Sequence, residues 1–202
     1  PIIDSGVLDA TQLGIIGACL YWTYAVGKFV NGFLADHCNI KKFMATGLIV
    51  SAFANFMMGI LGFWEGSAGI ASASMFIMFA IMWTLNGWSQ SMGSPPAIIS
   101  LSRWYPLKIR GTFYGFFSAS HNIGEFLSFL FVGGLVSVAG WQYGFIGAAI
   151  AGALGVVLII FMLHDSPQAK GLPSVAVWAG EETEGENTKT IDRSEERRVG
   201  KE

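Results

Sequence analysis

Residues 144–163 read GFIGAAIAGALGVVLIIFML, a run that contains no charged side chain. A helix rises 1.5 Å per residue, so a run of this length spans the ~30 Å hydrocarbon layer of a bilayer. A helix of a soluble bundle would instead carry Lys or Glu along its outer face. The run therefore predicts a membrane-spanning helix.

Four earlier stretches of the chain share this apolar character. The expected spans are about 13–35, 43–63, 73–101, 111–139 and 142–163. We expect residues 1–12 to be an extracytoplasmic segment and residues 164–192 to be a cytoplasmic tail that begins a central loop. Residues 193–202 resemble translated sequencing adapter, and we interpret them as a non-native scar. The sequence thus predicts an all-α membrane protein with five transmembrane helices.

The overall composition excludes several other classes of protein. Of 202 residues, 52% are hydrophobic and only 13% are charged, with a net charge of −2 and two cysteines. These values do not fit a disulfide-stapled module or a disordered chain. The slight negative charge argues against a nucleic-acid partner. No nucleophile–base pair, metal cluster or phosphate-binding loop indicates an enzyme, and we expect no cofactor.

Lysine and arginine occupy alternate loops, which predicts the orientation of the spans. In chain order, the cations that follow the first span are Lys41 and Lys42, those after the third are Arg103, Lys108 and Arg110, and the first after the fifth is Lys170. Cationic loops are cytoplasmic by the positive-inside rule, so residues 1–12 face outward. An outside start followed by an odd number of spans favours a missing upstream helix.

Three ionisable residues stand inside the expected spans: Lys28, His121 and Glu125. A charge at the centre of a bilayer is costly, so such residues usually face a bundle interior or a cavity. Polar residues at helical spacing accompany them on three spans. These companions are Tyr21, Tyr24 and Asn31; Asn86, Gln90 and Ser94; and Tyr114, Ser118 and Ser128.

Depths counted from the cytoplasmic loops place the three stripes in one layer. Lys28 lies ~12 Å from Asp36, Ser94 ~13 Å from Arg103, and His121 ~16 Å from Arg110, at 1.5 Å per residue. This coincidence favours a polar cavity near mid-membrane. Alternatively, Lys28 neutralises Glu125 as a structural pair, His121 is a packing residue, and the stripes only join helices.

Two features of the loops and the third span add to this interpretation. Pro95-Pro96 lies beside the polar layer and predicts a kink. The loop string Gly32-Phe33-Leu34-Ala35-Asp36, followed by Lys41-Lys42, resembles the loop signature of the major facilitator superfamily. His37, Asn39 and Ile40 depart from that signature.

A longer set of strings is more specific. In chain order they are YAVGKF at 24–29, GWSQSMGSPP at 87–96, Arg110-Gly111, SHNIG at 120–124 and DSPQAKGLP at 165–173. Together they are similar to the organophosphate:phosphate antiporter family, which includes hexose-phosphate and glycerol-3-phosphate transporters. The resemblance covers residues 5–175 and implies helices two to six of a twelve-helix fold.

The resemblance implies a transporter of the inner membrane that exchanges a phosphate ester for inorganic phosphate by alternating access. The family's substrate-binding lysine, tyrosine and histidine fall on Lys28, Tyr24 and His121. Its phosphate-binding arginines belong to the first helix and to the C-terminal half of the protein. The expected partners of this chain are therefore that first helix and that C-terminal half, the organophosphate substrate, inorganic phosphate and the lipid bilayer.

The other candidate site residues are Gln90, Ser94 and Asn122, which lie in the matching strings. Glu125 stands where the family usually has Gly, and we interpret it as a coupling residue or a structural ion-pair partner. The family also contains sugar-phosphate sensors, which bind without transport. A facilitator without a phosphate site is a third hypothesis, and Lys28 argues against it.

The charge alternation gives a testable topology. In the full-length protein, a single cysteine at position 65 should react with a membrane-impermeant maleimide added from outside, and one at position 108 should not. Labelling of intact cells measures this. The opposite pattern would invert the orientation and the helix numbering.

Overall fold

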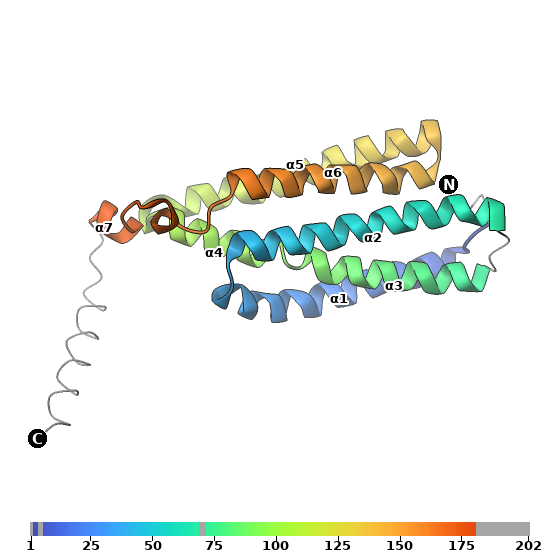
Figure 1. The fold of residues 1–202 in the computed structure, drawn as a ribbon, viewed down its shortest axis with the longest axis horizontal. Helices are drawn as coiled ribbons and strands as arrows, with labels where there is room; N and C mark the ends of the chain where they lie inside the picture. Colours follow the sequence, from blue (N-terminus) through green and yellow to red (C-terminus); the bar gives the residue numbers. More distant parts are fainter. Residues whose placement is uncertain (1, 4–5, 69–71, 181–202) are drawn as a thin grey trace, which may run out of the picture.

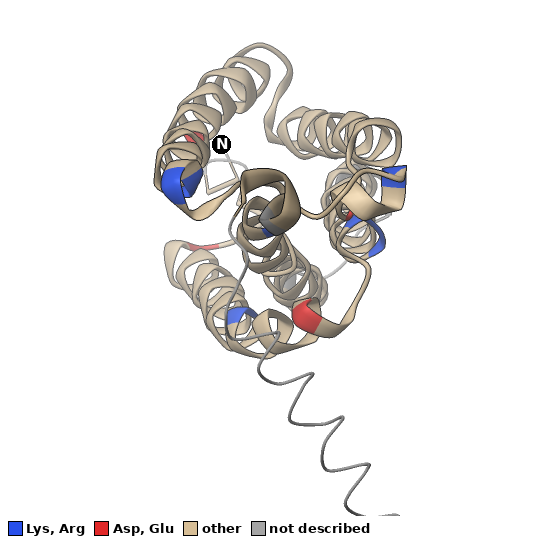
Figure 2. Ribbon diagram, turned by 90° about the vertical axis from the view of Figure 1, so that its left-hand side faces the viewer, with Lys and Arg blue, Asp and Glu red and all other residues tan. Residues whose placement is uncertain are grey.

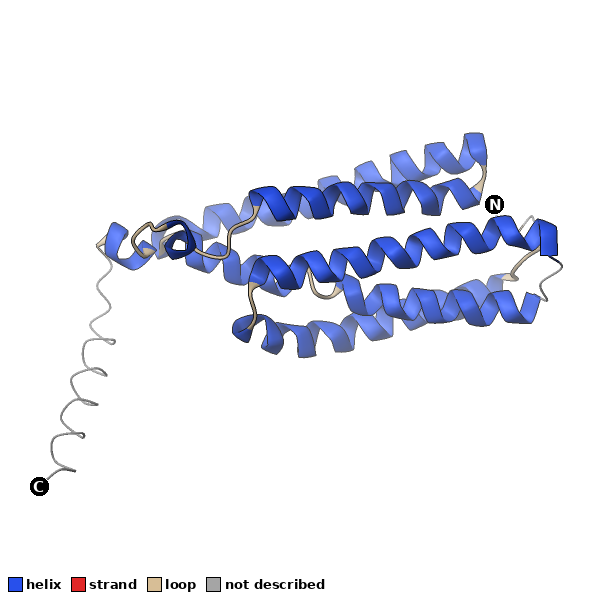
Figure 3. Ribbon diagram, viewed as in Figure 1, coloured by secondary structure: helices blue, strands red, loops and turns tan. Residues whose placement is uncertain are grey.

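The structure is a computed structural model that describes residues 2–3, 6–68 and 72–180, and these residues form only helices and loops (Figure 3). The helices are α1 (Ala10–His37), α2 (Ile40–Ala68), α3 (Ser72–Gln90), α4 (Ser94–Trp104), α5 (Leu107–Ala139) and α6 (Trp141–Met162). A 3₁₀ turn, η1 (Pro167–Lys170), and a short helix, α7 (Val175–Ala179), follow. The segment interpreted as a scar, 193–202, lies outside the described residues.

The long helices run side by side along one axis (Figure 1). Four of them are long and apolar enough to cross a membrane: Ala10–His37, Ile40–Trp64, Leu107–Ala139 and Trp141–Met162. Viewed along the bundle, few Lys, Arg, Asp or Glu residues appear on the helices (Figure 2). The expected all-α fold with several membrane spans is confirmed.

The third expected span, 73–101, differs from a single helix because it is divided into α3 and α4. The two pieces follow one another along the long axis (Figure 1). Between them, the N–H groups of Met92 and Gly93 bond the carbonyls of Ser89 and Gln90 at 3.1 and 3.2 Å, which is turn geometry. Pro95 and its neighbour Pro96 have no N–H to continue the helical ladder. The proline pair thus produces a break where we expected a kink.

Small residues allow the helices to approach closely. The main packed pairs are α1 with α3, α2 with α6, and α2 with α3. A Cβ added at Gly87 of α3 would overlap the Leu20 carbonyl and the Thr23 hydroxyl of α1. On the second pair, a Cβ at Gly59 would lie 2.6 Å from Ile146. Both interfaces therefore depend on the missing side chain.

An aromatic cluster fills the end of the bundle near the N-terminus. Phe79 and Trp141 meet edge to face at 6.0 Å, and Trp83 meets Phe145 in the same way at 5.7 Å. Val7, from the segment before α1, is 3% exposed in this core. Part of the N-terminal segment is therefore packed against the bundle, because its apolar side chains cover these rings.

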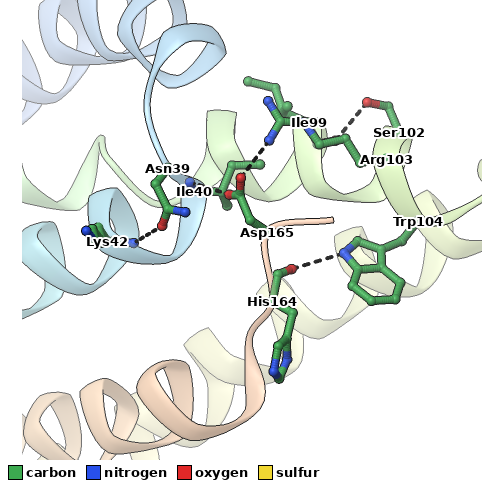
Figure 4. A network of polar contacts seen from close by, with 9 residues as sticks. All are labelled: Asn39, Ile40, Lys42, Ile99, Ser102, Arg103, Trp104, His164 and Asp165. Atoms are coloured by element: carbon green, nitrogen blue, oxygen red, sulfur yellow. Dashed lines mark hydrogen bonds and ion pairs between the residues drawn. The ribbon is translucent and has the colours of Figure 1, made fainter. Parts of the chain in front are cut away.

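A polar network ties three elements at the opposite end (Figure 4). Asp165, after α6, accepts the N–H of Ile40 at the start of α2 at 2.6 Å. Its second oxygen pairs with Arg103 of α4 at 3.1 Å. The Trp104 indole donates to the His164 carbonyl at 3.0 Å. The carboxylate also suits the positive end of α2, so one residue fixes the ends of three elements.

The glycine contacts predict a large effect from one methyl group. Gly87→Ala should force α1 and α3 apart and destabilise the protein by about 1–3 kcal/mol, as overpacking does. Gly115→Ala is the matched control, because nothing lies within 4 Å of a Cβ added there. Thermal unfolding of both variants of the full-length protein measures the difference. Equal melting temperatures would contradict the packing described here.

Candidate functional site: a polar layer across the bundle

Lys28 lies on the exposed face of α1, with its ammonium 4.5 Å from the centre of the Tyr24 ring. The spacing of four residues on a helix brings the two side chains together. The ring face attracts the cation but does not neutralise it. Within the described part of the chain, Lys28 forms no ion pair with Glu125. The contact therefore holds a positive charge partway along a membrane-spanning helix.

A hydrogen bond joins α1 to the break between α3 and α4. Asn31 is buried and donates to the Ser91 hydroxyl at 2.6 Å, and Ser91 donates to the Trp88 carbonyl at 2.6 Å. Gly27 permits this approach, because an added Cβ would collide with the same hydroxyl. The face of α1 that carries Gly27 and Asn31 is thereby placed beside the break that precedes α4.

A cavity of about 910 Å³ lies among α2, α3, α5 and α6. Its lining is mainly apolar. The polar residues that line it, called here the Asn86 group, are Ser51, Asn55, Asn86, Gln90 and Ser128. The Asn86 oxygen accepts from Ser51 at 2.6 Å and from Gln90 at 3.2 Å. The Asn86 amide nitrogen is buried and has no partner in the described part of the chain.

The three candidate residues of α5 lie apart from this group. His121, Asn122 and Glu125 are all exposed, and Asn122 donates to the Ser118 carbonyl at 3.1 Å. α5 packs on α6 and touches α4. Among the described residues, no hydrogen bond or ion pair joins these three side chains to Lys28 or Tyr24. The structure thus brings Lys28 and Tyr24 together, places Gln90 in the cavity and leaves the α5 stripe separate.

Ser51 and Asn55 are polar residues of the site region that the sequence analysis missed. They stand four residues apart on the second span, the spacing that singled out the other stripes. Asn55 donates to the Ser51 carbonyl at 2.9 Å. The same periodicity, applied to this span, would have found them.

The residues of the loop signature have separate local roles. Gly32 faces Pro95, with 3.9 Å from an added Cβ to that ring, and Asp36 is exposed at the end of α1. Arg110 donates to the carbonyls of Tyr105 and Ser102, each at 3.2 Å, and so holds the turn between α4 and α5. In the described residues, no group of three His, Cys, Asp or Glu side chains is placed to hold a metal ion.

Comparison of this sequence with known families and proteins shows which of them it is similar to. Residues 4–183 match the family described as Major Facilitator Superfamily. A probable hexose phosphate transport protein of Chlamydia muridarum is 39% identical over 86% of this chain. A membrane sensor protein, UhpC of Escherichia coli, is 34% identical over 88%, and a glycerol-3-phosphate transporter of Bacillus subtilis is 32% identical over 87%.

These relatives are longer proteins. The alignments cover 35% of the Chlamydia protein and 38% of each of the other two. This chain therefore spans about a third of the length of the curated relatives that it matches. The relatives confirm the resemblance to the organophosphate:phosphate antiporter family.

The polar group around Asn86 predicts a contrast between two asparagines. Asn86→Ala removes the acceptor of two side-chain bonds inside the bundle and should destabilise the full-length protein by about 1–3 kcal/mol. Asn122→Ala loses one exposed bond to its own helix and should unfold near the wild-type temperature. Thermal melts of the two variants check this. A larger effect at Asn122 would show that the Asn86 group is not a structural centre.

Proposed function

Since this chain belongs to the major facilitator superfamily, we propose that it is part of an inner-membrane transporter that exchanges a sugar phosphate or glycerol 3-phosphate for inorganic phosphate. The names of its relatives support an organophosphate as the substrate class. Exchange would proceed by alternating access, in which two halves of the protein rock about a central site.

The observation that carries this proposal is the ammonium of Lys28 within a membrane span, which has no acidic partner among the described residues. A phosphate ester is a dianion, and a lysine offers it a mobile point charge in a medium of low dielectric constant. Tyr24, Gln90 and Ser94 would supply neutral hydrogen bonds near that charge. The cost of the cation in the empty protein is offset when the anion binds.

The second wall of the proposed site is α5. His121 and Asn122 would approach the substrate from the side opposite Lys28, with Glu125 one turn beyond. Because this chain covers about a third of its relatives, the remaining partners are the first helix and the C-terminal half of the longer protein. Those parts would contribute the phosphate-binding arginines and cover the polar stripe of α5.

A non-transporting sensor is the second candidate function, because one relative, 34% identical to this chain, is named a membrane sensor protein. Uptake of labelled phosphate into vesicles that contain the full-length protein separates the two functions. A transporter exchanges internal phosphate for an external ester, whereas a sensor binds the ester without flux. Flux of a neutral sugar without any phosphate would instead support a facilitator.

The proposed site predicts a binding defect for Lys28→Ala in the full-length protein. A charged hydrogen bond contributes ~1.5–3 kcal/mol, so affinity for the ester should fall roughly one to two decades. His121→Ala should weaken binding less, and Lys41→Ala, outside the membrane span, should leave it unchanged. Titration calorimetry measures all three.

A purely structural role for Lys28 predicts a different result. If Lys28 is the partner of Glu125, Lys28→Ala leaves an acid unpaired within the membrane span and lowers the melting temperature, and adding Glu125→Gln restores it. Stability and affinity should therefore be measured on both single variants and on the double variant. Recovery of stability and of full affinity in the double variant would exclude Lys28 as a ligand.

A further inference from the structure

A second pocket, of about 400 Å³, lies where α4 and α6 end. Leu101, Trp104 and Tyr105 line it from α4 and its C-cap, and Leu163, His164 and Lys170 line it from the segment after α6. None of the proposed substrate-binding residues lines this pocket. It is therefore a separate feature of the bundle.

The pocket lies at the level of the membrane surface. α6 has 22 residues, so it is ~33 Å long and its last residue, Met162, lies at the edge of a ~30 Å hydrocarbon layer. Trp104 and Tyr105 are of the residue types that gather at this boundary. The pocket thus lies at the depth where lipid headgroups meet acyl chains.

The charge of the pocket is positive. In the part of the chain that the structure describes, the Lys170 ammonium has no carboxylate or carbonyl partner. His164 lines the same wall, with its Nδ1 3.1 Å from the Met162 carbonyl oxygen and Nε2 as its other polar ring atom. Arg110 lies next to the wall, since its guanidinium donates to the Tyr105 carbonyl. The adjacent acid, Asp165, is already engaged by Arg103 and by a backbone N–H.

We propose that this pocket binds the phosphate of an anionic phospholipid from the leaflet that faces this end of the bundle. Lys170 and His164 would contact the phosphate, and Leu101, Met162 and Leu163 would contact the first carbons of the lipid chains. Basic pockets between helix ends favour anionic headgroups in this way. A water-soluble phosphate would leave the apolar wall unused, so the combination of walls favours the lipid.

Native mass spectrometry of the full-length protein tests this, with phosphatidylglycerol and phosphatidylcholine as probes. Lys170→Gln should weaken retention of phosphatidylglycerol about fivefold, the effect of one cation near an anionic surface, and leave phosphatidylcholine unchanged. Lys42→Gln is the matched control: it removes an exposed cation that does not line the pocket, and its effect should be smaller than twofold.

A second variant tests the cavity independently of charge. Ser100 also lines the pocket, and Ser100→Phe should fill it and abolish preferential retention of phosphatidylglycerol, whereas Ser100→Ala should not. Thermal melts establish that both variants fold; if Ser100→Phe does not, the Lys170 and Lys42 pair decides the question. Binding of the phosphate ester to Lys170→Gln should equal that of wild type, which separates this proposal from the transport proposal.

Three results would overturn the lipid site. Equal losses for Lys170→Gln and Lys42→Gln would show a general surface charge effect. Competition by soluble glycerophosphoglycerol at the concentration of the lipid would show a site for water-soluble phosphate esters. Lipid retention that does not change in Lys170→Gln would show that Lys170 and this pocket do not hold the lipid phosphate.

Discussion

A hydrocarbon layer offers no hydrogen-bond partner to a polar group, and this constraint shapes the whole chain. Backbone groups must bond within their own segment, which leaves the helix as the structure of each span. Most charged residues lie near the helix ends, where Arg103 and Asp165 pair. Polar side chains that remain inside bond to one another, as Asn31 does with Ser91. The polar layer is therefore held by the same requirement that makes the helices.

Paired polar groups do not by themselves bring helices together in lipid. The lipid tails are as apolar as the side chains, so association depends on close packing and on interhelical hydrogen bonds. Gly27 and Gly87 let α1 approach α3 and the break between α3 and α4, and Gly62 lets α2 approach Trp141 of α6. The α1 contacts also set the position of Lys28. Glycines distant from any ligand are thus part of the geometry of the candidate site.

Much of the fold follows from sequence pattern, because membrane spans are set by length and by the absence of charge. The fourth and fifth expected spans agree with α5 and α6 to within four residues. For the third span, Pro95-Pro96 predicts a kink, but the structure has a complete break between two helices. The turn at residues 91–93 also involves the hydrogen bond between Ser91 and Asn31, which the sequence pattern does not indicate. Periodicity identifies a polar face without identifying what that face contacts.

The same limit explains why the candidate site was only partly predictable. Lys28, Ser94 and His121 were placed in one layer by counting along helices, which gives depth but no lateral distance. Laterally, α1 is fixed against α3 and α4 by glycines, whereas α5 has no buried residue and is held by α6 and α4.

The Asp165 network joins the segment after α6 to α2 and α4, so the helices against which α5 packs are connected at one end of the bundle. A partly exposed ion pair contributes little stability in water, so this network sets the register of the helix ends while the glycine contacts hold the helices close together. The rocking mechanism proposed above would need these close contacts, because a bundle that deforms cannot transmit the closure of one end into the opening of the other.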